Sequence, residues 1–167
     1  WINISSTKEF KDRYDKKLIS VGRLENQKNF TELIEIFSNT DFEIEIYGSG
    51  TKKSELIDSA KKYNTKLKIF EPVSNEILVN NLSDYKIYIS SSNYEGNPKS
   101  LLEAMSAGCI VIAPNNKNIA EIIKNGFNGF IYSSEIDDLN KLIDKLDSMD
   151  LFEVKKNAFE YVKRNNS

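Results

Sequence analysis

Short apolar runs alternate with amphipathic stretches along most of the chain. The runs are rich in β-branched and aromatic residues, which favours strands, and they fall at residues 18–21, 42–47, 67–70, 87–90, 110–113 and 130–132. Between and after them, hydrophobic residues recur at helical spacing in 30–37, 56–60, 77–82, 139–146 and 152–162. This alternation predicts an α/β fold, a doubly wound parallel sheet of about six strands with helices on both faces. Ligands of such sheets bind beyond the carboxyl ends of the strands.

The length and net charge of the chain restrict the classes of partner that we expect. The 167 residues, 40% of them hydrophobic, can bury one sizeable core. A formal net charge of −2 gives no broad attraction to nucleic acid or to an anionic membrane, so any phosphate must be bound locally. No apolar run approaches the roughly 20 residues that span a bilayer. We therefore expect no nucleic acid partner and no transmembrane segment.

The chain contains no histidine, which removes several chemistries. A Ser-His-Asp triad and a Cys-His pair are both excluded, and a zinc site would lack its usual ligands. Asp137 and Asp138 are the nearest approach to an acidic metal motif, but they fall at an expected helix start, where negative charge is favourable anyway. We expect no metal. The single cysteine, Cys109, excludes an intrachain disulfide, fits a reducing compartment and is expected to be buried in a strand.

Residues 92–108 place two carboxylates, Glu95 and Glu103, around a turn and the helix that it opens. Gly96 allows a ligand to approach the backbone closely, and Pro98 suits the first helical position. At the positive end of the helix dipole, outward-pointing amides would favour a phosphate; these are the amides of Asn97, Lys99 and Ser100. Spacing alone leaves a second interpretation open, in which Glu103 is half of an i,i+4 pair with Lys99 on a solvated helix face.

The same segment resembles the signature of GT-B glycosyltransferases in the large retaining group (group 1, family 4 type), which transfers hexoses from UDP-, GDP- or ADP-sugars. Two glutamates separated by seven residues and followed by Ala-Met-x-x-Gly form a specific pattern. Other features of that family occur in the right order at 21–24 with 27–29, 47–50, 73–76, and 121–123 with Gly126 and Gly129. The resemblance covers nearly the whole chain. It implies one Rossmann-like half of a GT-B fold.

The resemblance also implies a division of the chain and a set of site residues. Residues 1–16 are the remainder of an interdomain linker, 17–150 the nucleotide-sugar-binding domain and 151–167 a C-terminal helix. The implied catalytic residues are Glu95, which faces the transferred sugar, and Arg23 and Lys28, which hold the donor pyrophosphate. The implied donor-binding residues are Gly22, Gly48, Val73, Gly96, Asn97, Pro98, Lys99, Ser100, Leu101 and Glu103.

Within that set, Glu103 would accept hydrogen bonds from the ribose hydroxyls, and Val73 would make main-chain contacts to the base. Glu71 and Pro72 stand where the family commonly has glycine, so the base stays open among uracil, guanine and adenine. Two alternatives also stay open. Arg23 and Lys28 taken singly are ordinary loop cations, and Glu121 either orients the nearby loop or is a solvated residue on a helix ending at 125–126.

The function implied is donor binding for a retaining hexosyltransferase in cell-envelope polysaccharide or glycolipid synthesis. Its partners would be a nucleotide-sugar donor, an N-terminal GT-B domain and an acceptor glycan or lipid-linked glycan. We expect no cofactor, little transfer by this domain alone, and a cytoplasmic location, peripheral at the inner membrane face where the acceptor is lipid-linked. Two alternatives are a non-catalytic nucleotide- or partner-binding module of the same fold and a UDP-sugar epimerase, a class that usually employs histidine.

Overall fold

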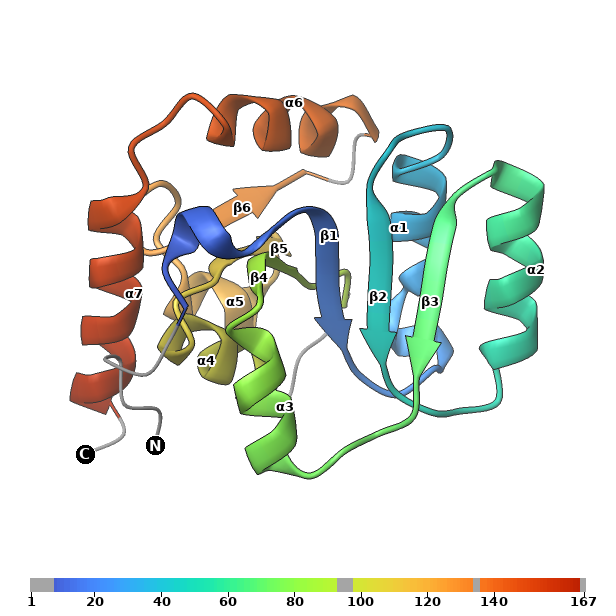
Figure 1. The fold of residues 1–167 in the computed structure, drawn as a ribbon, viewed down its shortest axis with the longest axis horizontal. Helices are drawn as coiled ribbons and strands as arrows, with labels where there is room; N and C mark the ends of the chain where they lie inside the picture. The colour runs from blue at the N-terminus through green and yellow to red at the C-terminus, as the bar shows by residue number, and fades with distance from the viewer. Residues whose placement is uncertain (1–7, 93–97, 134–135, 166–167) are drawn as a thin grey trace.

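A six-stranded parallel sheet forms the centre of the molecule (Figure 1). The computed structural model describes residues 8–92, 98–133 and 136–165. In chain order the strands are β1 (Tyr14–Val21), β2 (Glu43–Tyr47), β3 (Lys66–Phe70), β4 (Tyr85–Ile89), β5 (Ile110–Pro114) and β6 (Phe130–Tyr132). Their order across the sheet is β3-β2-β1-β4-β5-β6, and every adjacent pair is parallel. The order reverses between β1 and β4, which makes that point the topological switch of the sheet.

Helices cover both faces of the sheet, as the alternation of apolar patterns predicts. One hydrophobic cluster joins the sheet to α1 (Phe30–Ile36), α2 (Lys53–Tyr63) and α6 (Ile136–Leu146). A second cluster, on the other face, joins it to α3 (Asn75–Leu82), α4 (Lys99–Ser106), α5 (Lys117–Ile122) and most of α7 (Phe152–Asn165), whose Val154 reaches the first cluster. Two short 3₁₀ helices, η2 (Phe10–Asp12) and η3 (Asn26–Lys28), precede β1 and α1. The predicted doubly wound class is confirmed.

Three of the element boundaries that differ from the prediction have a clear structural reason or bear on the site. β1 begins at Tyr14 rather than at residue 18, because backbone pairing with β4 continues into exposed residues that carry no apolar pattern, and the strand therefore takes in three residues assigned to the linker. α4 begins at Lys99, with Pro98 as its N-cap rather than its first helical residue. α5 ends at Ile122 instead of near 125–126, because the Asn128 side chain bonds to the Ile122 carbonyl and to the Lys124 amide.

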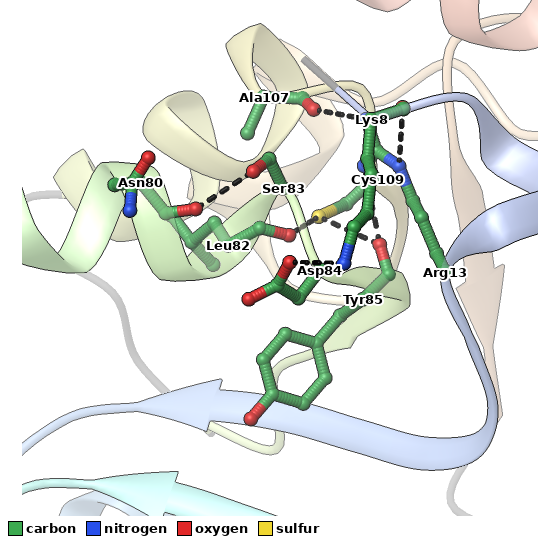
Figure 2. Close-up of polar contacts among 9 residues, drawn as sticks. All are labelled: Lys8, Arg13, Asn80, Leu82, Ser83, Asp84, Tyr85, Ala107 and Cys109. Carbon is green, nitrogen blue, oxygen red and sulfur yellow. Dashed lines mark hydrogen bonds and ion pairs between the residues drawn. The ribbon is translucent and has the colours of Figure 1, made fainter.

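The segment before β1 is tied to the sheet by Arg13, whose side chain is 5% exposed. Its guanidinium donates to the carbonyl of Lys8 through both Nε (3.0 Å) and Nη2 (2.9 Å). It also donates to the carbonyl of Tyr85 (3.2 Å) and to that of Ala107 (2.8 Å), the last residue before the glycine that follows α4. Figure 2 shows these bonds meeting beside the Cys109 sulfur. One side chain thus links the chain entering β1, the start of β4 and the end of α4.

The C-terminal helix α7 packs through one face and leaves part of its aromatic side exposed. Val154, Ala158 and Val162 are buried in the core, as their spacing predicts, whereas Phe152 is 62% exposed. None of the helices in the described parts of the chain is long and apolar enough to cross a membrane.

Candidate functional site

The carboxyl ends of β1 and β4 carry the two loops that flank the switch point. A hydrogen bond joins them across it, because the buried Ser91 hydroxyl donates to the carbonyl of Lys28 over 2.6 Å. The loop after β1 is therefore held against the loop after β4 at the position where doubly wound sheets bind nucleotides.

Glycines allow the loops after β1 and β2 to approach one another closely. A Cβ on Gly48 would lie 1.9 Å from the Gly22 carbonyl oxygen, so no other residue fits there without a backbone shift. A Cβ on Gly22 would lie 3.1 Å from the Cδ and Cε of Lys28, which shows that the lysine side chain runs over this glycine. The half-buried stem of Lys28 is thus placed by Gly22, while Arg23 beside it is exposed.

A second contact fixes the loop after β1 to the start of α2. The carboxylate of Glu25 accepts from the amide of Thr51 (3.0 Å) and from its hydroxyl (2.8 Å). Both bonds lower the pKa of Glu25, and the bond from the Thr51 backbone has the larger effect. The charge of Arg23 lowers this pKa by a smaller amount. The lowered pKa keeps the Glu25 carboxylate charged, and with it these two bonds charge-assisted, to a lower pH than for an ordinary glutamate.

Glu103 lies on α4, between side chains that pack into the core. Its Oε2 atom is buried and has no hydrogen-bond partner among the described residues. Burial raises the pKa of the Glu103 carboxyl, and the charge of Lys99 lowers it to a smaller extent. Lys99 and Glu103 form no ion pair within the described structure, so the solvated i,i+4 pair is not what the structure contains. An acceptor oxygen that is buried and unsatisfied is costly unless a ligand supplies the donor.

Val73 lies in the loop after β3, at the same edge of the sheet, and is 38% exposed. Beside it, the rings of Tyr47 and Phe70 stack with centroids 4.7 Å apart, at the carboxyl ends of β2 and β3. The Tyr47 hydroxyl accepts a bond from the amide of Asn81 on α3 (3.1 Å). The loop that contains Val73 therefore begins directly after a stacked aromatic pair.

The structure places the described members of the predicted site in the loops that follow the carboxyl ends of β1 to β3 and in or just before α4, the helix that follows β4. They are Gly22, Arg23, Lys28, Gly48, Val73, Pro98, Lys99, Ser100, Leu101 and Glu103. The Leu101 side chain is buried in the core, which leaves only its backbone to face a ligand. Glu95, Gly96 and Asn97 lie outside the described residues. Ser91, which sequence reasoning missed, carries no motif that would have indicated its bond to Lys28.

Metal-binding groups are not gathered at this edge. Within residues 8–92, 98–133 and 136–165, no three Asp, Glu or Cys side chains come together in a way that could hold a metal ion. Asp137 and Asp138 lie in the first turn of α6, as predicted.

A parallel sheet of this order, with helices on both faces and a switch point between β1 and β4, defines a doubly wound α/β domain. The chain belongs to the family of glycosyl transferases group 1, whose sequence model matches residues 2–164. The fold is that of one GT-B half, since its structural neighbours are glycosyltransferases of this type.

Two relatives and one solved structure illustrate the similarity. The amylovoran biosynthesis glycosyltransferase AmsD of Erwinia amylovora is 33% identical over 137 residues, which are 76% of this chain and 37% of AmsD. N-acetylgalactosamine-N,N'-diacetylbacillosaminyl-diphospho-undecaprenol 4-alpha-N-acetylgalactosaminyltransferase of Campylobacter jejuni is 28% identical over 81% of this chain and 37% of its own. TarM of S. aureus, solved with fondaparinux, alpha-GlcNAc-glycerol and UDP, superposes with a TM-score of 0.82 over all of this chain and 36% of TarM, at 23% identity. The chain thus spans little more than a third of these proteins.

Proposed function

We propose that this chain is the nucleotide-sugar donor-binding domain of a retaining hexosyltransferase that builds a cell-envelope polysaccharide or a lipid-linked glycan. Family membership supports the transferase activity. The names of the two relatives, one of amylovoran biosynthesis and one acting on a diphospho-undecaprenol-linked saccharide, support the class of acceptor. The UDP bound to TarM supports a nucleotide-sugar donor.

The observation that carries the proposal is the buried, unpartnered Oε2 of Glu103 on the helix that begins beyond β4. Folding has removed this oxygen from water without giving it a donor, which costs about 1–3 kcal/mol for a buried polar group. The vicinal hydroxyls of a ribose supply two donors at the spacing of a carboxylate. Binding the nucleoside would therefore restore the hydrogen bonding that this oxygen lost on folding.

Arg23 and Lys28 would hold the diphosphate of that nucleotide. Both follow the end of β1 within seven residues, and Gly22 lets the Lys28 stem lie close to the backbone at the switch point. Phosphate oxygens accept strong charge-assisted bonds from guanidinium and ammonium groups. As the bond from sugar to phosphate breaks, these two cations would stabilise the negative charge on the leaving nucleotide, and the step would need no metal ion.

Glu95 would face the hexose as a positioning and charge-stabilising residue. The acceptor site would belong to an N-terminal domain facing this one across a cleft, so the domain alone would bind donor but transfer little. With a lipid-linked acceptor, the intact enzyme would work at the inner face of the membrane.

Calorimetric titration of the domain with UDP, GDP and ADP, without added metal, tests the proposal. The site variants are Glu103→Ala and the double variant Arg23→Ala/Lys28→Ala. The matched control is Lys61→Ala/Lys62→Ala, which removes the same charge from the exposed far end of α2. We expect one nucleotide to bind selectively, with both site variants at least about tenfold weaker, equivalent to roughly 1.4 kcal/mol, and the control unchanged.

Other results would redirect or end the proposal. Equal affinity in parent and site variants would show that the site is wrongly placed. If neither this domain nor the full-length parent binds any of the three nucleotides, donor binding is refuted. Donor binding without any transfer by the full-length parent would favour the non-catalytic module.

A further inference from the structure

Lys28 is followed by a residue in a conformation that is unusual for its type. Asn29 ends η3 and begins α1 with φ 53° and ψ 38°, in the left-handed region. Side chains with a Cβ avoid that region at a cost of about 1–2 kcal/mol, and asparagine tolerates it best when its amide can bond locally. The backbone turn at Asn29 sets the direction of the chain on either side, and therefore that of Lys28.

Glu32 supplies the local bond. The Nδ2 of Asn29 donates to the Oε2 of Glu32 over 2.8 Å, and the amide of Glu32 donates to the Asn29 carbonyl over 3.1 Å. Glu32 is the third residue of α1, the position from which a glutamate commonly reaches back to the residue that caps its helix. Here the reciprocal bond goes to the side chain, because the Asn29 amide already donates to the Asn26 carbonyl over 3.1 Å.

The Glu32 carboxylate lies near Tyr132 on β6. It is half-buried, and burial raises its pKa, while Tyr132 acts on that pKa in the opposite direction. The Tyr132 hydroxyl also lies 3.4 Å from the Ser90 carbonyl at the end of β4. Ser91, the next residue, donates to the Lys28 carbonyl. The carbonyl of Lys28 is thus held from the loop after β4 through Ser91, and the turn at Asn29 is held by Glu32.

We infer that Glu32 is a positioning residue for the donor diphosphate: it holds Asn29 in the left-handed conformation and so keeps Lys28 directed over Gly22. This inference rests on the proposed function, because it assigns Lys28 the diphosphate as its ligand. Loss of the Glu32 bond would let Asn29 relax toward right-handed geometry. Lys28 would then leave its place beside Gly22, although its own charge is unchanged.

A rescue experiment separates this role from a general structural one. Glycine adopts the left-handed region without a tether, so Asn29→Gly should make Glu32 dispensable. With the nucleoside diphosphate that the parent binds best, we expect Glu32→Leu to weaken binding about fivefold, as the loss of one charge-assisted bond would. Glu32→Gln, which keeps an acceptor oxygen, should stay within about twofold of the parent. Asn29→Gly and Asn29→Gly/Glu32→Leu should bind equally well, and the control Glu35→Leu, an exposed position on the same helix, should bind like the parent.

An NMR measurement made without nucleotide tests the inference independently of nucleotide binding. The HN–Hα coupling and backbone chemical shifts of Asn29 report its conformation by NMR, and Glu32→Leu should shift them away from left-handed values. The positioning role is refuted if Lys28→Ala weakens binding but Glu32→Leu does not. It is also refuted if Asn29→Gly fails to rescue Glu32→Leu. In both cases the proposed function stands. If neither the domain nor the full-length protein binds a nucleotide, the proposed function fails. Unchanged NMR values in Glu32→Leu would refute the tether whatever the outcome of the binding experiment.

Discussion

Replacing Arg13 by methionine should destabilise the domain more than any exposed charge would. Methionine keeps the apolar stem of the side chain but removes every donor, so the hydrogen bonds to the carbonyls of Lys8, Tyr85 and Ala107 are lost together. The bonds to Tyr85 and Ala107 are buried. In the variant, these two carbonyls would be left in the protein interior without their guanidinium donor (Figure 2).

The magnitude follows from those two carbonyls. A buried acceptor left without a partner costs about 1–3 kcal/mol, and losing a cation at the end of α4 adds about 0.3–1 kcal/mol through the helix dipole. The Cys109 thiol, 3.5 Å from the Tyr85 carbonyl, offsets part of the loss. Burial lowers the pKa of Arg13, but a guanidinium stays protonated in proteins, so the removed group is charged. We expect Arg13→Met to lower the free energy of unfolding by about 2–4 kcal/mol.

Urea unfolding followed by circular dichroism measures this difference. The control is Lys8→Ala, which breaks an exposed ion pair with Asp84 (3.0 Å) but keeps the Lys8 carbonyl. Exposed pairs of this kind contribute little to stability. Arg13→Lys retains charge but not the planar fork of donors and should fall between the parent and Arg13→Met. A loss below about 1 kcal/mol in Arg13→Met, or a loss equal to that of Lys8→Ala, would refute the assignment of Arg13 as the anchor.

Three further predictions concern the site and the core. Glu103→Gln should unfold at equal or slightly higher urea concentration than the parent, by up to about 1 kcal/mol, yet bind nucleotide about tenfold more weakly in calorimetry. Because burial raises the pKa of Glu103, the folded domain binds this proton more tightly than the unfolded chain does. Stability should therefore rise, and nucleotide affinity fall, as the pH drops from neutrality through that raised pKa, and Glu103→Gln should lose both dependences. Gly48→Ala should lower the melting temperature and cost about 2–3 kcal/mol, because its Cβ meets the Gly22 carbonyl, and an unchanged melting temperature would contradict that contact. Burial raises the pKa of the Cys109 thiol to about 12, so a thiol reagent at pH 8 should label it only in denaturant, and rapid labelling of the native domain would contradict its burial.

The strands and the fold class were predictable from the sequence because buried segments carry a simple pattern of apolar residues. Residues of the central strands, such as Ile44 and Ile112, are apolar because both faces of the sheet are covered. The start of β1 was not predictable in this way, since Tyr14 joins the strand through backbone pairing with Tyr85 while remaining 41% exposed. The order of the strands also lies beyond local pattern, because it depends on which runs pair across long distances in the chain.

The residues of the candidate site also fall into two groups, those that the sequence could indicate and those that it could not. Residues that belong to a local motif, such as Arg23 and Glu103, could be found by resemblance, and the described ones all follow strand ends at one edge of the sheet. Contacts between motifs could not be found so. The bond from Ser91 to the Lys28 carbonyl joins residues 63 positions apart, and serine after a strand has many uses. Nor could spacing decide whether Glu103 was paired, because that depends on the packing around α4.

The edge of the sheet formed by β3 bears on how the molecule behaves in concentrated solution. Lys66 and Lys68 are exposed on this strand and stand in register with Glu43 and Glu45 of β2, so opposite charges alternate across the last two strands. A second molecule adding its own β3 edge to edge would bring like-charged lysines together and separate them from water. Charged edge positions of this kind oppose such stacking without affecting the core. These two lysines, which contact Asp41 and the Phe70 ring within the domain, would thereby also oppose polymerisation through the exposed edge of β3.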